Sequence, residues 1–131
     1  MLVLRHAFGW QFAGIVFLAL ALVVAMLPEI PFWHFDPNSP FALSDKALHM
    51  LTFTFLAAWF SGQYSRQSYW RIALGLVLFG ALIEVFQGMV SYRTSEWMDL
   101  YADAVGIAAC LIIALLGVGG WSQRVELWLE R

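Results

Sequence analysis

The sequence predicts an all-α, polytopic membrane protein, a bundle of four transmembrane helices with both termini in the cytoplasm. Hydrophobic residues make up 62% of the 131 residues and charged residues only 12%, with a mean hydropathy of +0.75. A soluble domain of this size needs far more charge to cover its surface. The apolar residues also fall into four runs of about 20 residues, the length that crosses a bilayer. We therefore expect one transmembrane domain over residues 1–131.

Polar connectors separate the four predicted spans, and local signals mark their ends. Four prolines from Pro28 to Pro40 stop any helix after the first span. Ser44 is a suitable N-cap for the second span, and the glycine-rich segment 117–120 ends the fourth. The spans are predicted to cover residues 8–27, 44–60, 70–90 and 98–116.

The two ends of the chain each carry an apolar segment that needs interpretation. Arg5 followed by the Ala19-Leu20-Ala21 run is similar to a secretory signal, but the apolar run continues to Leu27, which favours an uncleaved helix. In residues 121–131, Trp121 and Trp128 share one helical face, so we expect this tail to lie along the membrane interface.

Basic residues set the predicted orientation. A cytoplasmic N-terminus places five arginines inside and two basic residues outside, as the positive-inside rule requires. We therefore expect a multi-pass protein of the cytoplasmic (inner) membrane. The net charge of −2 gives no basic patch for nucleic acid, and a single cysteine, Cys110, excludes an intrachain disulfide. The inner residues are Arg5, Arg66, Arg71, Arg124 and Arg131, and the outer ones are Lys46 and Arg93.

In this orientation three spans carry their ionisable residues to the extracytoplasmic side. Glu84 lies six residues before the end of its span, roughly 9 Å deep at 1.5 Å per residue. A carboxylate near mid-membrane costs on the order of 2.5–3.5 kcal/mol unless it lines a polar cavity. We therefore expect a shared polar cavity between the second, third and fourth helices. Its residues are Asp45, Lys46, His49, Glu84, Gln87, Arg93, Asp99 and Asp103.

Catalytic roles are assigned to three of these residues. His49, oriented by Asp45 one turn earlier, would exchange a proton with the substrate, and Glu84 would be its buried partner. The alternative for the first pair is a salt bridge at the helix start. No activated serine or cysteine nucleophile is found, so acid–base chemistry is the economical scheme.

The remaining residues are assigned to substrate binding: Lys46, Gln87, Arg93, Asp99 and Asp103. Arg93 would clamp a phosphate or carboxylate, or it would simply neutralise Asp99 and Glu96. Gln87 would contact a ligand or join two helices. No cofactor is predicted, although the clustered carboxylates and His49 supply enough ligand atoms for a divalent metal.

The motifs "DKALH" and "EVFQ", followed by Arg93, Asp99 and Gly106, resemble the VanZ-like family of small integral membrane proteins. The family is named for a member associated with resistance to the glycopeptide teicoplanin. The resemblance covers about residues 44–108. This sequence departs from the family pattern at Phe53, where a tyrosine is usual, and at Asp103, where an asparagine is usual.

The resemblance and the polar residues together suggest a protein that acts at the outer leaflet on an amphipathic cell-envelope substrate. The expected partners are membrane lipids, a lipid-linked precursor or a lipophilic glycopeptide. The alternative is a non-catalytic accessory protein that binds a lipid or a partner, so the sequence leaves open whether the protein is an enzyme. Transport ranks last, because the inner halves of the spans carry almost no polar residues.

Overall fold

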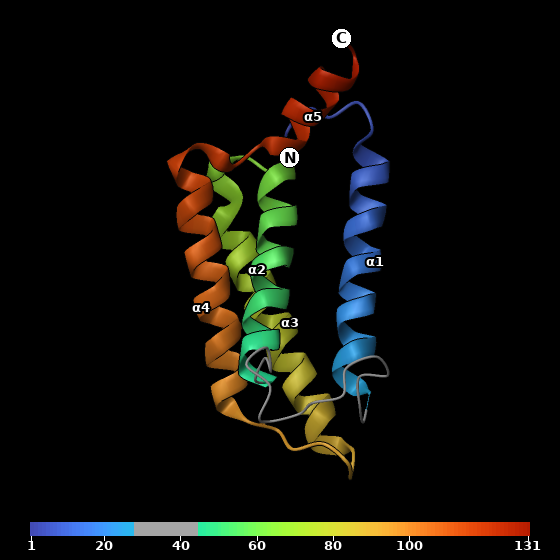
Figure 1. Cartoon of the computed structure of the whole chain (residues 1–131), viewed down its shortest axis with the longest axis vertical. Helices are drawn as coiled ribbons and strands as arrows, with labels where there is room; N and C mark the ends of the chain where they lie inside the picture. The colour runs from blue at the N-terminus through green and yellow to red at the C-terminus, as the bar shows by residue number, and fades with distance from the viewer. Residues whose placement is uncertain (28–44) are drawn as a thin grey trace, which may run out of the picture.

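The computed structural model describes residues 1–27 and 45–131, which form a helical bundle with both termini at the same end (Figure 1). The predicted loop from Pro28 to Pro40 and the Ser44 cap lie outside these residues. No β-strand occurs in the described ranges. The elements are α1 (Ala7–Met26), α2 (Asp45–Gln63), the 3₁₀ turn η1 (Arg66–Ser68), α3 (Tyr69–Met89), α4 (Trp97–Ile113), the π-helical turn η2 (Ala114–Val118) and α5 (Trp121–Leu129).

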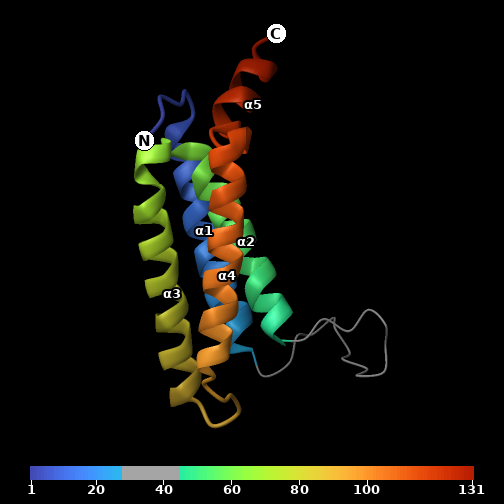
Figure 2. The ribbon, with the colours of Figure 1, turned by 90° about the vertical axis from the view of Figure 1, so that its left-hand side faces the viewer.

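The four long helices run alternately in opposite directions. At the end that holds the termini, the Leu2 amide donates a hydrogen bond to the carbonyl of Gln63 at 2.9 Å, which joins the start of the chain to the end of α2. At the other end the Tyr92 hydroxyl, beyond α3, donates to the carbonyl of Met26 at the end of α1 at 3.0 Å. Helices α1 and α3 are therefore parallel, and Figure 2 shows α3 and α4 side by side in the opposite sense.

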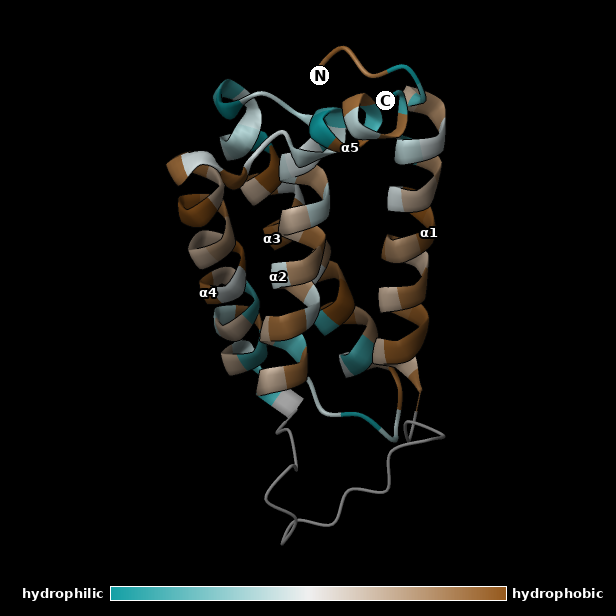
Figure 3. Cartoon of the chain, turned by 45° about the horizontal axis from the view of Figure 1, so that its top comes forward, coloured by the Kyte–Doolittle hydropathy of each residue, from teal (hydrophilic) through white to brown (hydrophobic). Residues whose placement is uncertain are grey.

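Three segments are long and apolar enough to cross a membrane: Ala7–Met26, Arg66–Met89 and Trp97–Val118. Large hydrophobic side chains such as Phe12, Leu78 and Ile112 are exposed on these segments, and Figure 3 colours much of their length as hydrophobic. For the first, third and fourth predicted spans, the structure thus confirms helices that are long and apolar enough to cross a membrane. Helix α2 has 19 residues, but its polar first turns and its serine, glycine and glutamine end make it less apolar than the other three.

Helix α2 lies at the centre of the packing. Its buried residues Phe53 and Leu56 meet Ile83 of α3 and Ile107 of α4 in one hydrophobic core. By contrast, only 6% of the spanning window of α1 is buried, with Gly14 its one buried residue. Helix α1 is therefore a loosely attached outer wall of the bundle.

Glycines determine how closely the central helices approach. A Cβ atom added at Gly106 of α4 would overlap the backbone carbonyl of Met50 in α2. A Cβ atom added at Gly80 of α3 would lie 2.8 Å from Oδ2 of Asp103 in α4. Helix α4 can therefore pack tightly against both neighbours, whereas Gly75 faces open space.

The C-terminal helix α5 fastens the start of α1. The Glu126 carboxylate accepts hydrogen bonds from the amides of Arg5 and His6 at 2.8 and 2.9 Å, and from Trp10 Nε1 at 2.8 Å. Helix α1 has no side-chain cap hydrogen bond, and Glu126 instead accepts from the amides of the two residues directly before the helix. The predicted position of this tail at the membrane interface stays a prediction.

Aromatic side chains reinforce the same junction. The ring centroids of Trp10, Trp59 and Trp121 lie 5.3 to 5.5 Å from one another. Trp121 Nε1 also donates to the carbonyl of Ala58 at 2.8 Å. Helices α1, α2 and α5 thus share one tryptophan cluster, while Trp128 remains exposed.

The Gly106→Ala substitution is expected to destabilise the protein by about 1–3 kcal/mol, because the added methyl group must push α4 away from a rigid backbone carbonyl. Equilibrium unfolding in detergent micelles measures the change. Gly75→Ala is the matched control, and it should be neutral or slightly stabilising because alanine favours a helix. Equal stability of the two variants would contradict the proposed close approach.

Acid is expected to loosen the α1–α5 junction. Burial opposes ionisation of Glu126, yet hydrogen bonds from the His6 and Arg5 amides and from Trp10 outweigh it and lower the pKa of this carboxyl. Its stabilising contribution is therefore complete above the ordinary glutamate pKa of about 4.3 and is lost as the pH falls through the lower folded-state value. Tryptophan fluorescence during thermal unfolding at several pH values follows this loss.

Two variants separate Glu126 from other carboxylates. Glu126→Gln should melt at a lower temperature than the wild type at pH 7 and should lose less stability in acid. Glu130→Gln removes only an exposed ion pair with Arg5, so it should behave like the wild type. The fall in melting temperature between neutral and acidic pH should be larger for the wild type than for Glu126→Gln. Equal falls for the two proteins would refute this role of Glu126.

Candidate functional site: a buried acidic cluster beside an apolar cavity

The ionisable side chains of α2, α3 and α4 meet at the end of the bundle opposite the termini. We call His49, Glu84, Asp99 and Asp103 the acidic cluster. All four side chains are buried, with at most 9% of any residue exposed. The predicted convergence of three helices on one group of polar residues is therefore present in the structure.

His49 is held by two aspartates of α4. Its Nδ1 lies 3.0 Å from Oδ1 of Asp103, and its Nε2 lies 3.8 Å from Oδ2 of Asp99. A carboxylate this close to Nδ1 favours the tautomer in which Nδ1–H donates to Asp103. The close approach of α2 and α4 at Gly106, one turn beyond Asp103, brings these side chains within reach.

Glu84 connects the cluster to the loop between α3 and α4. Its Oε2 accepts a hydrogen bond from the backbone amide of Glu96 at 2.9 Å and another from the Ser95 hydroxyl at 3.3 Å. Its Oε1 is buried and has no hydrogen-bond partner among the described residues. One oxygen of this carboxylate therefore holds the loop, and the other is available for a ligand.

The two basic residues near the cluster have different surroundings. Lys46 Nζ lies 2.7 Å from Glu96 and 3.7 Å from Asp99, so its single positive charge is shared between the two acids. Arg93 forms no ion pair with any described residue, and its buried Nε has no hydrogen-bond partner there. The neutralising role that the sequence allowed for Arg93 therefore belongs to Lys46.

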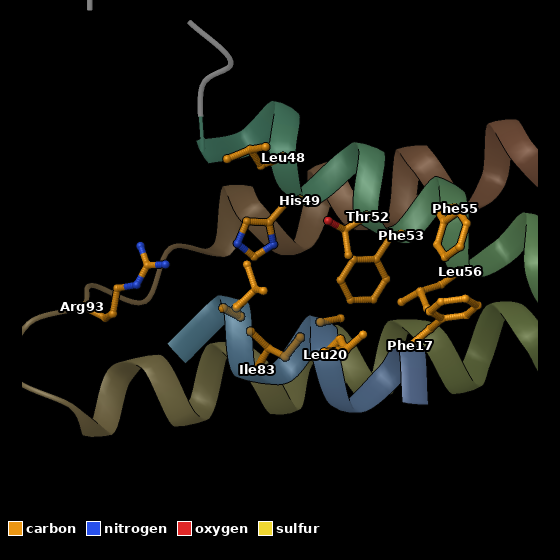
Figure 4. A pocket seen from close by; sticks show the side chains of 13 residues that line it. Phe17, Leu20, Leu48, His49, Thr52, Phe53, Phe55, Leu56, Ile83 and Arg93 are labelled. Atoms are coloured by element: carbon orange, nitrogen blue, oxygen red, sulfur yellow. The ribbon is translucent and has the colours of Figure 1, made fainter. Parts of the chain in front are cut away.

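A cavity of about 260 Å³ begins beside His49 (Figure 4). Arg93 and His49 lie toward one end of it, Phe17 and Phe55 toward the other, and Thr52 between them. Its walls come from α1, α2 and α3 together with Arg93. The cavity thus lies on the α1 side of α2, whereas the predicted cavity lay between α2, α3 and α4, where the structure places the acidic cluster.

The other predicted site residues have structural contacts. Gln87 Nε2 donates to the carbonyl of Ala25 at 2.9 Å, which joins α3 to the end of α1. Asp103 is fully buried against His49, so it orients the imidazole and does not face the cavity. Asp45 is the first residue of α2, but its side chain lies outside the described part of the chain. The orienting role that the sequence assigned to Asp45 therefore stays a prediction, and the structure adds Asp103 as a carboxylate beside His49 Nδ1.

Sequence reasoning missed the contribution of α1. Phe17 and Leu20 line the cavity, but α1 is apolar nearly all round, so no pattern distinguishes its cavity face from its lipid face. It also missed the loop contacts of Ser95 and Glu96 with Glu84, because hydrogen bonds to a backbone amide leave no signal in the spacing of side chains.

The fold and the site define a helical bundle with three membrane-compatible helices, a buried acidic cluster and an adjacent apolar cavity. The chain matches no model of a known protein family, and no curated protein or solved structure is similar to it. Membership of the VanZ-like family therefore stays a prediction from the motifs.

Replacing Lys46 should raise the pKa of the Glu96 carboxyl. The hydrogen bond and the charge of Lys46 hold that pKa below its usual value. In Lys46→Gln the pKa should return to about 4.3, while Lys46→Arg should keep it low; ¹³C NMR titration of the carboxyl measures both. The stabilisation from this exposed pair is small and is lost as the pH falls through the lower, folded-state pKa. An unchanged pKa in Lys46→Gln would contradict the pairing.

Proposed function

We propose that this protein is a VanZ-like membrane protein that binds an anionic amphiphile of the cell envelope from the outer leaflet. A lipid-linked precursor, a lipid or a lipophilic glycopeptide has the required chemistry. The observation that carries the proposal is the position of Arg93, a cation with no ion-pair partner among the described residues, at the polar end of an apolar cavity. The two parts of the site match the two parts of an amphiphile.

The electrostatics of Arg93 favour an anionic headgroup. A guanidinium that is partly withdrawn from water loses hydration and needs an acceptor in exchange. Phosphate and carboxylate groups suit it best, because the planar guanidinium donates two parallel hydrogen bonds to them. The His49 imidazole is beside the same end of the cavity, so it would contact the headgroup as well.

The apolar lining favours a hydrocarbon chain. Phe17, Leu20, Phe53, Leu56 and Ile83 form the walls. A volume of about 260 Å³ is below the usual range of pockets that enclose a whole drug-sized ligand, so it would hold a segment of a longer chain. Because α1 packs loosely, such a chain would enter from the bilayer beside it.

The direction of the helices supports four spans. Helices α1 and α3 are parallel, so a chain that crosses the membrane in both must cross back between them, and α2 is the described helix that can do so. With the arginine-rich end in the cytoplasm, the acidic cluster and the cavity would face the extracytoplasmic side.

Catalysis is the second candidate function, and the His49–Asp103 pair favours it. A histidine oriented by a buried aspartate is a common acid–base arrangement. Incubation with a bound amphiphile followed by mass spectrometry separates the candidates: a catalyst yields a product that His49→Ala does not, whereas a binding protein returns the amphiphile unchanged.

Arg93→Ala is expected to weaken binding of a polyprenyl phosphate at least tenfold, because a hydrogen bond to a charged group contributes about 1.5–3 kcal/mol. Native mass spectrometry of the protein in detergent micelles measures the bound fraction. Arg93→Lys should retain part of the affinity, and Arg66→Ala, which removes an exposed arginine at the other end of the bundle, should retain all of it.

The same polyprenol without its phosphate is the ligand control, and it should bind the wild type and Arg93→Ala equally weakly. Equal binding of the alcohol and the phosphate to the wild type would overturn the proposed headgroup site. Unchanged phosphate binding by Arg93→Ala would do the same.

A further inference from the structure

Three side chains of the acidic cluster could share one metal ion. A nitrogen of His49, a carboxylate oxygen of Glu84 and one of Asp99 all lie within 4.8 Å of one another, and all three residues are buried. They come from three different helices, α2, α3 and α4. An ion at about 2.0–2.2 Å from each ligand atom needs only a small inward movement of these side chains.

A second observation at the same place points to a ligand. Glu84 is 2% exposed, and its Oε1 has no hydrogen-bond partner among the described residues. Its other oxygen already accepts two hydrogen bonds from the loop. A buried carboxylate oxygen without a donor is costly, and a bound cation would satisfy it.

Asp103 gives His49 the support that metal-binding histidines have. A histidine that ligates a metal usually donates its second N–H to a carboxylate, which fixes the ring and raises the basicity of the ligating nitrogen. Here Nδ1 faces Asp103 at 3.0 Å, and Nε2 faces Asp99 at 3.8 Å. With the proton on Nδ1, Nε2 is the nitrogen on the Asp99 side of the ring, where a cation would interact with both residues.

The charges of the cluster favour a divalent ion. Glu84, Asp99 and Asp103 bring three carboxylates together, while Lys46 shares its single positive charge between Asp99 and Glu96. A dication would offset most of the negative charge that remains. A buried site with that charge excess and with incomplete protein coordination fits an ion that accepts water or a substrate atom as a further ligand.

We propose that His49, Glu84 and Asp99 bind one divalent transition-metal ion, with Zn²⁺ favoured. The mixed imidazole and carboxylate ligands suit zinc better than Mg²⁺ or Ca²⁺, which prefer oxygen ligands alone. The site does not require amphiphile binding. Because His49 belongs to both the cluster and the cavity wall, a metal here would lie next to the proposed headgroup site.

The test is a Zn²⁺ titration of the full chain in detergent micelles at pH 7, after metal removal with a chelator, by calorimetry and elemental analysis. One Zn²⁺ per chain is expected, and excess Mg²⁺ should not displace it. Glu84→Gln should weaken binding at least 100-fold while its amide oxygen still accepts the Glu96 N–H. Asp103→Asn should weaken binding 10- to 100-fold, as is usual for residues that orient a ligand.

Glu130→Gln is the matched control, because it removes an exposed carboxylate at the opposite end, and it should bind Zn²⁺ like the wild type. Metal-free melting temperatures show whether each variant is folded. If Glu84→Gln unfolds, Asp99→Asn tests the same ligand set and should also lose binding. Arg93→Ala should retain Zn²⁺ binding even where it loses the polyprenyl phosphate, so the two proposals can fail separately. Substoichiometric Zn²⁺ on the wild type, or equal affinity of Glu84→Gln and Glu130→Gln, would overturn the site.

Discussion

The contact between the backbones of α2 and α4 is the constraint on which the rest of the bundle depends. Gly106 has no side chain, so α4 can lie directly against the carbonyl of Met50. One turn away, the same proximity allows His49 to reach Asp103. Gly80 of α3 lies against the other oxygen of Asp103, so the third helix approaches the same aspartate. Two glycines thus allow three helices to enclose one group of polar side chains inside the bundle.

The position of Glu84 in an apolar helix follows from this arrangement. Facing lipid, a carboxylate at that depth would be unfavourable. Facing the bundle interior, it accepts a hydrogen bond from a loop amide and lies beside the imidazole of His49. The loop that follows α3 has no regular secondary structure at Ser95 and Glu96, and Glu84 satisfies its backbone there. The same carboxylate therefore has a structural role through one oxygen, while its other oxygen is buried and has no hydrogen-bond partner among the described residues.

The helix positions could be predicted from the sequence because hydrophobic runs and glycine and proline breaks are local signals. The convergence of Glu84, Asp99 and His49 could be predicted as well, since alternating spans place their polar ends on one side. The contact between His49 and Asp103 could not be predicted, because the distance between α2 and α4 depends on packing at Gly106. The contribution of α1 to the cavity wall could not be predicted either, because a uniformly apolar helix has no face that the sequence distinguishes.

The hydrogen bonds of Glu84 to Ser95 and Glu96 have a further consequence, because Arg93 belongs to the same loop. Any change in the charge or ligation of Glu84 acts on the segment that positions the guanidinium. If a metal at Glu84 and an anion at Arg93 bind as proposed and both act on this loop, their binding is thermodynamically linked, and each would alter the affinity of the other by the same factor. The order in which two such ligands arrive would not change the final state, only the path to it.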